Sequence, residues 1–302
     1  MKTYWRIKMF DVIIPVFKTE PEYLREAVDS VLRQSFSDFK IYISDGTPED
    51  HEWHSKKTLA DYDDERITIV QQVGKGISDA RNQAGKLGSN PYLATLDSDD
   101  TWFELKLEYY NQLLKENPDL HLIWGEAQIN QTMKSPFGRA QKISSFGGIL
   151  NDWDKTLPQH RWFRVCWNAL MTSTQVYSRE AVESVGWWNP TITMGEDTDL
   201  NVKILKKYYD AHQVEASVGT YRVHLNQTTK GGESHGEESG IEHPERPDTF
   251  ENMFKELKES DSSISDDYWV WLYQTVNAER GVGRGERLQF SMMQGGRNIV
   301  TL

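Results

Sequence analysis

The 302-residue chain carries 46 acidic residues against 34 basic ones, a formal net charge of −12, and 37% of its residues are hydrophobic. This hydrophobic content suffices for a packed core and argues against wholesale disorder, while the acidic balance argues against nucleic-acid binding over the whole surface. The single Cys166 can form no internal disulfide, which fits a reducing compartment. No apolar run reaches the roughly 18 residues of a membrane-spanning helix, so we expect a cytoplasmic protein without an integral membrane segment.

Strand and helix patterns alternate through the first third of the chain. Residues 10–17 (FDVIIPVF) form an apolar run typical of a buried strand. Pro21 suits a first helical position, and apolar residues spaced by three and four continue from there to Leu32. The further elements expected here are strands at 40–43, 67–70 and from 92, a polar helix at 49–61 and an amphipathic helix at 76–87. The alternation predicts an α/β fold with a mostly parallel central sheet flanked by helices.

The rest of the chain divides into two parts. The patterns up to residue 224 predict helices at 103–116, 179–185 and from 195, strands at 122–124 and 218–224, an extended segment at 165–177 and a long loop at 131–161. After Asn226, glycines and acidic residues predict an exposed linker, followed by two helical patterns. We therefore expect one domain at 1–229 and a helical C-terminal extension at 230–302.

An acidic stretch follows the fourth expected strand. The apolar run from Tyr92 to Leu96 ends in Asp97-Ser98-Asp99-Asp100. Open α/β sheets bind their ligands at the carboxyl ends of parallel strands. Asp97 and Asp99 can both address one hard divalent cation that carries substrate phosphates. A solvated acidic turn is the alternative, since Asp and Ser also favour turns.

Five further segments accompany this stretch in a fixed order. They are Val12-Ile13-Ile14-Pro15-Val16-Phe17, Ser44-Asp45-Gly46-Thr47, Gly76-Ile77-Ser78-Asp79-Ala80-Arg81-Asn82, Gly195-Glu196-Asp197-Thr198-Asp199-Leu200 and Tyr221-Arg222-Val223-His224. Over roughly residues 9–229, the chain resembles the inverting family-2 glycosyltransferases of the GT-A (Rossmann-like) fold. The resemblance implies a metal-dependent catalytic domain at 1–229. Such a domain moves a sugar from a nucleotide-diphosphate donor, with a UDP-sugar favoured, to a hydroxyl of a carbohydrate or other acceptor in glycan synthesis.

The resemblance implies a nucleotide pocket near the ends of the first two strands. Its residues are Pro15, Val16 and Phe17, with Asp45 on the uracil edge and Arg81 on base or phosphate oxygens. Ser44 stands where the family has an acid, which leaves open whether the base is uracil. The structural alternatives are a plain turn at Asp45 and a salt bridge from Arg81 to Asp45 or Asp79.

The resemblance also implies a metal site. Asp99 ligates the metal, Asp97 contacts the metal shell or the ribose, and His224 completes the shell or touches the diphosphate. Mn²⁺ or Mg²⁺ suits such a site, and the sequence does not separate the two. A purely structural histidine is the alternative for His224, and Asp100 is expected to be a helix cap or to support the ligands.

The acidic pair Glu196-Asp197 matches the family's pair near the acceptor. We assign the general base to Asp197, with Glu196 and Asp199 as fallbacks, because an inverting displacement needs one carboxylate to take the acceptor proton. Acids in a first helical turn can instead simply complement the helix dipole. Trp187 and Trp188 are expected behind the donor sugar, with ordinary core packing as the alternative.

Two competing functions share features of this pattern. A sugar nucleotidyltransferase would carry a Gly-rich phosphate loop after the first strand, and Lys18-Thr19-Glu20-Pro21 is not one. A nucleotide-sugar-binding protein without turnover is supported only by Ser44. The extension at 230–302 is expected to form part of the acceptor site, a lid or an oligomer contact, with no affinity for polyanions.

Overall fold

The structure is a computed structural model, in which residues 10–131, 142–143, 170–192, 195–208, 211–224, 290–292 and 299–301 are described. Its main sheet contains the strands β1 (Phe10–Val16), β2 (Phe39–Asp45), β3 (Ile67–Gln71), β4 (Tyr92–Thr95), β5 (Thr101–Trp102), β6 (Leu122–Gln131), β7 (Lys142–Ile143), β8 (Val176–Ser178) and β9 (Ala211–Val223). The helices are α1 (Pro21–Leu32), α2 (Ser55–Thr58), α3 (Gly76–Leu87), α4 (Lys106–Glu116), α7 (Arg179–Ser184) and α8 (Glu196–Tyr208), with a 3₁₀ turn η1 (Thr172–Thr174) before β8.

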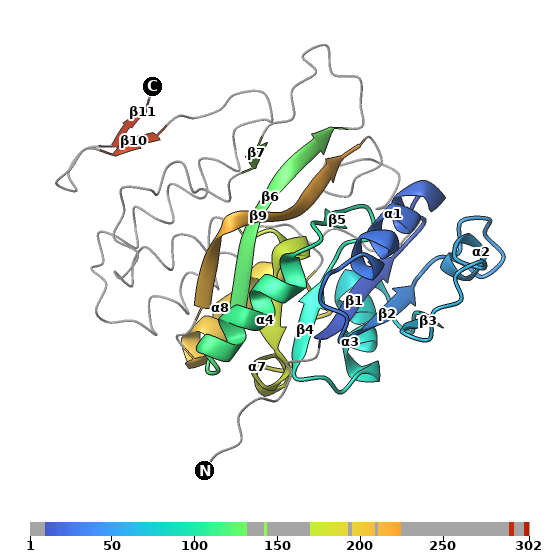
Figure 1. Cartoon of the computed structure of the whole chain (residues 1–302), viewed down its shortest axis with the longest axis horizontal. Helices are drawn as coiled ribbons and strands as arrows, with labels where there is room; N and C mark the ends of the chain where they lie inside the picture. Colours follow the sequence, from blue (N-terminus) through green and yellow to red (C-terminus); the bar gives the residue numbers. More distant parts are fainter. Residues whose placement is uncertain are drawn as a thin grey trace.

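The strands form one continuous sheet in the order β3-β2-β1-β4-β8-β6-β9-β5, with β7 paired to β6 (Figure 1). The first four strands of this order are mutually parallel. Strand β8 is antiparallel to both of its neighbours, β4 and β6, and β9 runs parallel to β6. The expected α/β fold with a mostly parallel sheet and flanking helices is confirmed.

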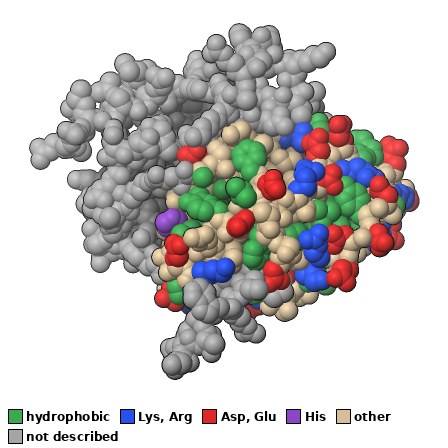
Figure 2. All heavy atoms as spheres, viewed as in Figure 1, with side chains coloured by type: hydrophobic (Ala, Val, Ile, Leu, Met, Phe, Trp, Pro, Cys, Tyr) green, Lys and Arg blue, Asp and Glu red, His purple; other side chains and the backbone are tan. Residues whose placement is uncertain are grey.

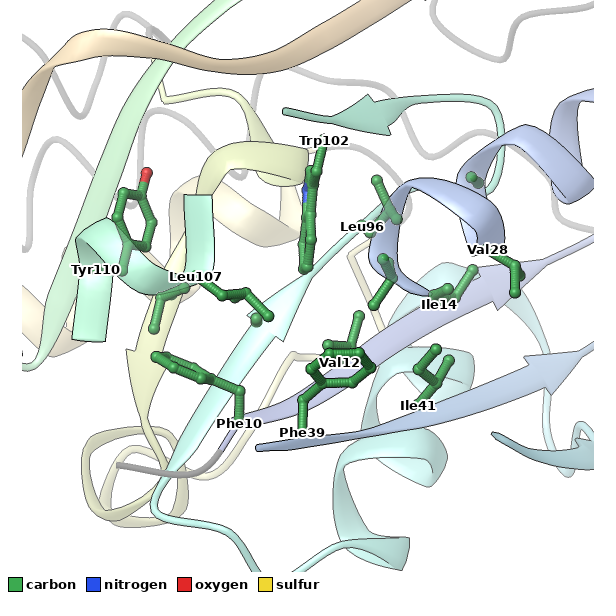
Figure 3. Packing of buried hydrophobic residues seen from close by; sticks show 14 of the residues in the cluster. Phe10, Val12, Ile14, Val28, Phe39, Ile41, Leu96, Trp102, Leu107 and Tyr110 are labelled. Atoms are coloured by element: carbon green, nitrogen blue, oxygen red, sulfur yellow. The ribbon is translucent and has the colours of Figure 1, made fainter. Parts of the chain in front are cut away.

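Successive residues of β1 point to opposite faces of the sheet, and both faces are covered. Val12 and Ile14 belong to one buried cluster, and Ile13 belongs to the other. The first cluster is shown in Figure 3, where Trp102 and Leu107 pack over the strands. Because each face supplies a core of its own, every residue of β1 is buried, which is why the strand is apolar apart from Asp11, which is paired with Arg179.

Helix α1 follows the predicted pattern closely. Pro21 stands in its first turn, and its buried residues include Leu24, Ala27, Val28 and Val31. Full burial of one such aliphatic side chain stabilises the fold by about 1.5–3 kcal/mol relative to exposure. This apolar face therefore fixes α1 against the strands and places the β1–α1 connection at the edge of the sheet where parallel strands end.

Several expectations about regular structure need correction or lie outside the described residues. Most of the long loop expected at 131–161 lies outside them, with only residue 131 and β7 described. The helix expected at 49–61 is wrong, because only α2 is helical there and the His54 side chain caps its start. The strand expected at 122–124 continues to Gln131. Within 230–302 the structure describes only β10 (Phe290–Met292) and β11 (Ile299–Thr301), which pair antiparallel, so the linker and helices expected there lie outside the described residues.

The described helices do not suit a bilayer, since none is long and apolar enough to cross one. On the face seen in Figure 2, acidic and basic side chains are interspersed rather than gathered into a basic patch.

Candidate active site

Arg81 lies at the centre of the candidate site and joins two distant acidic segments. Its guanidinium donates to Asp97 Oδ1 at 2.9 Å and to Glu196 Oε1 at 2.6 Å. Helix α3 carries Arg81, Asp97 follows β4, and Glu196 begins α8. The side chain of Arg81 is 1% exposed. The alternative salt bridge to Asp45 or Asp79 is therefore not what the structure shows.

The charged groups of this cluster shift one another's pKa values. Burial alone would lower the pKa of Arg81, but the carboxylates of Asp97, Glu196 and Asp197 raise it above its ordinary value. Burial raises the pKa of Asp97 and of Glu196, and Arg81 opposes both rises. The Nε of Arg81 has no hydrogen-bond partner in the part of the chain that the structure describes.

Asp197 lies next to Glu196 but has different partners. Its Oδ2 accepts a hydrogen bond from Thr172 Oγ1 at 2.9 Å, and its Oδ1 accepts from the Thr198 backbone N–H at 2.7 Å. Asp199, one of the two fallbacks, forms an ion pair with Lys203 at 2.7 Å. Asp197 is therefore the one acid of this turn that is bound to neither an arginine nor a lysine in the described structure.

Asp99 and His224 come together although 125 residues separate them. His224 Nε2 lies 2.8 Å from Asp99 Oδ2. Arg222 donates to the Asp99 carbonyl at 2.8 Å, and Tyr23 lies against the imidazole with ring centroids 5.2 Å apart. His224 Nδ1 is buried and has no hydrogen-bond partner among the described residues.

Asp99 and His224 offer donor atoms that suit a divalent cation, but the described residues do not form a complete set of metal ligands. A carboxylate oxygen and an imidazole nitrogen are suitable donors for Mn²⁺, and the carboxylate alone suits Mg²⁺. However, the described residues contain no group of three or more His, Cys, Asp or Glu side chains arranged to hold a metal. Asp97, the third predicted ligand, directs Oδ1 to Arg81. A divalent cation bound by Asp99 and His224 therefore remains a prediction.

Asp100 supports the loop from inside. It is buried, and it accepts hydrogen bonds from Ser173 Oγ and from the Arg222 backbone N–H, the latter at 2.8 Å. Burial, together with the neighbouring Asp99 and Asp97, raises its pKa well above the ordinary value. Asp100 therefore anchors the acidic loop rather than facing a ligand.

The predicted nucleotide-side residues lie at the ends of β1 and β2. Pro15 and Val16 are buried in β1, and Phe17 is half-buried next to Gly46. Asp45 is fully buried, and its two oxygens accept the backbone N–H groups of Thr47 (2.8 Å) and Ser55 (2.6 Å). In this structure Asp45 organises the turn and the start of α2, and its contact with a base remains a prediction.

The two predicted tryptophans point to different places. Trp187 has a positive φ of 69° and lies against α3, where a Cβ on Gly85 would stand 2.7 Å from its Cζ3. Trp188 is fully buried and packs edge-on against Tyr177 at 5.5 Å. Core packing, the stated alternative, describes Trp188 as the structure has it, and a contact of either ring with a sugar remains a prediction.

Sequence reasoning missed the segment that connects these acids. Thr172 and Ser173 of η1 bond to Asp197, Asp100 and the backbone of Asp97. Short polar residues in a stretch expected to be extended carry no pattern that indicates such contacts. A Thr-Ser-Thr run just before a buried strand was the one available signal.

Comparison with known proteins agrees with this fold. The family model described as Glycosyl transferase family 2 matches residues 11–185. An uncharacterised glycosyltransferase of Bacillus subtilis, EpsJ, is 24% identical over 74% of this chain and 64% of its own length. The Escherichia coli protein WfgD, named as a UDP-Glc:α-D-GlcNAc-diphosphoundecaprenol β-1,3-glucosyltransferase, is 27% identical over 45% of this chain and 53% of its own length. The chain thus spans less than two thirds of either relative.

Two solved structures share the architecture. Staphylococcus aureus TarS 1–349, in complex with UDP-GlcNAc, superposes with a TM-score of 0.64 at 13% identity, covering 89% of this chain and 71% of that one. The mannosyltransferase PcManGT from Pyrobaculum calidifontis, in complex with GDP-Man and Mn²⁺, gives a TM-score of 0.56 at 14% identity, covering 91% of this chain and 75% of that one. Identities this low show a common fold only, but the family model covers more than half of the chain. The chain belongs to glycosyl transferase family 2.

Proposed function

We propose that the protein is an inverting, metal-dependent glycosyltransferase that moves a sugar from a nucleotide-diphosphate donor, preferentially a UDP-sugar, to an acceptor hydroxyl. The observation that carries this proposal is the buried Arg81, which binds Asp97 on one side and Glu196 on the other. It brings the acidic loop after β4 and the acidic start of α8 into one site. A donor diphosphate at the first segment then lies close to an acceptor hydroxyl at the second.

In the proposed reaction, Asp197 is the general base. It takes the proton of the acceptor hydroxyl while that oxygen bonds to the anomeric carbon of the donor. The bond from the anomeric carbon to the diphosphate oxygen breaks, and the nucleoside diphosphate leaves with the electron pair. Arg81 orients Glu196 beside the base. In this proposal its Nε, which has no hydrogen-bond partner among the described residues, donates to the sugar or to the diphosphate.

The proposed cofactor is Mn²⁺ or Mg²⁺ at Asp99 and His224, with Asp97 in contact with the same group. A bound divalent cation would neutralise charge on the departing diphosphate. The Mn²⁺ bound together with GDP-Man in the PcManGT complex supports this part of the proposal. Asp99 and His224, whose side chains lie 2.8 Å apart, are the residues that would hold it.

The donor and acceptor classes are proposed from weaker support. UDP-GlcNAc is bound in one TarS structure, and UDP-Glc appears in the name of WfgD, while PcManGT holds GDP-Man. The name of WfgD also supports a glycan-synthesis role with a carbohydrate-bearing acceptor. Residues 1–229 are the proposed catalytic domain, and a role of 230–302 in the acceptor site or in an oligomer contact remains a prediction.

The test is thermal unfolding with UDP, GDP, ADP and CDP, each with and without Mn²⁺, followed by nucleoside diphosphate release from UDP-glucose, UDP-GlcNAc and GDP-mannose. A ligand at 100 times its dissociation constant stabilises the folded state by about 2.7 kcal/mol. We expect the largest shift with UDP, only when Mn²⁺ is present, and release from at least one sugar donor. A shift without release would favour the binding-protein alternative, and no shift with folded protein would contradict donor binding.

A further inference from the structure

The turn η1 contacts the acids of both segments of the candidate site. Thr172 Oγ1 donates to Asp197 Oδ2 at 2.9 Å. Ser173 Oγ donates to the buried carboxylate of Asp100 and accepts the backbone N–H of Asp97 at 3.1 Å. Two consecutive hydroxyl side chains thus reach the acidic start of α8 and the acidic loop after β4.

The turn is itself held from outside through its backbone. All three of its carbonyl groups accept hydrogen bonds from side chains of other elements. The donors are Thr95 on Thr172 (2.5 Å), Trp102 and Lys106 on Ser173 (2.6 and 2.8 Å) and Tyr110 on Thr174 (2.9 Å). Strands β4 and β5 and helix α4 therefore fix the position of η1.

Lys106 is a buried side chain that helps to hold η1 in position. Its side chain is buried, and its ammonium lies 3.6 Å from the centroid of the Trp102 ring. Burial lowers its pKa well below the ordinary value. Removing a lysine from water is costly unless the group is paired or hydrogen-bonded, and the hydrogen bond that Lys106 makes is to the carbonyl of Ser173. The fold thus commits a buried lysine side chain to holding a three-residue turn.

Thr174 shows what a hydroxyl with a purely local role does in the same turn. Its Oγ1 donates to the Met171 carbonyl, three residues back. Thr172 donates instead to Asp197, whose other oxygen already accepts the N–H of Thr198. Asp197 Oδ1 is bound to the start of α8, so the hydrogen bond from Thr172 fixes the orientation of Asp197 Oδ2.

We propose that η1 is the positioning element that sets the acceptor-side acid against the donor-side loop, with Thr172 the positioning residue for Asp197 and Ser173 that for Asp97. The assignment of Asp197 as the base rests on the proposed function. The orientation of its carboxylate by Thr172 does not, and it can be measured separately.

The test compares Thr172→Val with Thr174→Val, because both remove one hydroxyl of the same turn. The kinetic readout is UDP or GDP release from whichever of UDP-glucose, UDP-GlcNAc and GDP-mannose the wild type turns over. A hydrogen bond to a charged group accounts for a change of about tenfold to a hundredfold. We expect kcat of Thr172→Val to fall by this factor with the donor KM within about twofold, a much smaller loss in Thr174→Val, and recovery in Thr172→Ser.

Ser173→Ala should act on the other segment, raising the donor KM more than it lowers kcat. Crystal structures of the wild type and Thr172→Val supply a readout that needs no activity, and we expect the Asp197 carboxylate to be rotated in the variant. An unchanged Asp197 in that crystal structure, or equal kcat losses in Thr172→Val and Thr174→Val, would overturn the inference. A wild type that releases no nucleoside diphosphate from any of the three donors would instead overturn the proposed function.

Discussion

At the scale of single residues, the assignment of roles to the acids of α8 can be tested by charge removal. Asp197→Asn keeps the shape of the side chain but cannot take a proton. We expect transfer to fall by about 10²–10⁴-fold, with the Mn²⁺-dependent stabilisation by UDP retained. Initial rates of nucleoside diphosphate release and thermal unfolding measure the two effects.

Asp199→Asn is the matched variant for that experiment, because Asp199 lies in the same helical turn and is paired with Lys203. It should cost far less activity than Asp197→Asn. Equal losses from the two substitutions would mean that the acids act through the helix dipole rather than as a base. A loss confined to Glu196→Gln would move the role to the other fallback.

Arg81 gives a prediction for stability at the same scale. Arg81→Met leaves the carboxylates of Asp97 and Glu196 without their buried cation, and breaking a buried pair in this way costs about 3–5 kcal/mol. Arg66→Met is the comparison, because its pair with Asp64 is partly exposed and such a pair contributes about 0–1 kcal/mol. Urea unfolding of both variants measures the difference. Similar small losses would show that the Arg81 cluster is open to solvent.

At the scale of elements, α3 and the Trp187 ring are in close contact. A Cβ at Gly85 would lie 2.7 Å from Trp187 Cζ3. Alanine is the better helix former by about 1 kcal/mol, but overpacking costs typically about 1–3 kcal/mol, so we expect Gly85→Ala to destabilise the protein. In the Trp187→Ala background the same change should stabilise it, and a double-mutant cycle in urea measures this coupling. Stabilisation by Gly85→Ala alone would contradict the contact.

The contact of α1 with the segment after α2 makes stability depend on pH in the alkaline range. Tyr62 donates to Asp29 Oδ1 at 2.7 Å, and burial, then this hydrogen bond, raises the pKa of Tyr62 to about 12. A raised pKa in the folded state gives a contribution to stability that is complete below about pH 10, the unfolded value, and is lost as pH rises towards 12.

The stability difference between wild type and Tyr62→Phe should therefore be about 1 kcal/mol at pH 8 and shrink above pH 10. Urea titrations at several pH values measure this difference. A Tyr62→Phe difference that is constant from pH 8 to 11 would rule out the hydrogen bond.

The elements also show what could be read from the sequence and what could not. Strand β1 and helix α1 were predicted because burial on both faces, or on one helical face, leaves a pattern in neighbouring residues. The prediction of a helix at 49–61 was wrong because Asp45, ten residues before Ser55, accepts the Ser55 N–H and so fixes the start of α2. Such a distant contact leaves no local pattern.

The candidate site also has features that the sequence predicted and features that it did not. The acidic segments were identified as candidates from their residue types, whereas the partners of Arg81 lie 16 and 115 residues away and were not predicted. The tryptophan pair was treated as one feature, but Trp187 lies against Gly85 of α3, whereas Trp188 packs against Tyr177. These neighbours come from distant segments of the chain and leave no local pattern.

At the scale of the whole molecule, the main sheet combines strands from residues 10–131 with strands from residues 176–223. Strand β8, from residues 176–178, lies between β4 and β6, and β9 lies between β6 and β5. A chain ending at residue 229 should therefore unfold in one cooperative transition and keep its stabilisation by UDP and Mn²⁺. A chain ending at residue 131 lacks β8, β9 and Glu196, and it should show neither property.

Circular dichroism during urea unfolding and thermal unfolding with UDP measure both properties. Loss of the UDP effect in the chain ending at 229, with cooperative unfolding retained, would place part of the donor site in residues 230–302. Loss of cooperative unfolding itself would mean that the proposed domain boundary at 229 is wrong.

The position of β8 has a consequence for the growing polypeptide on the ribosome. Strand β4 emerges with an unpaired edge, and its partner β8 follows about eighty residues later in the chain. During that interval β4 presents free backbone groups to any other nascent strand, a situation that favours mispairing between chains. A slow translation rate would lengthen this exposure, so the yield of native protein should depend on elongation speed and on chaperones that shield strand edges.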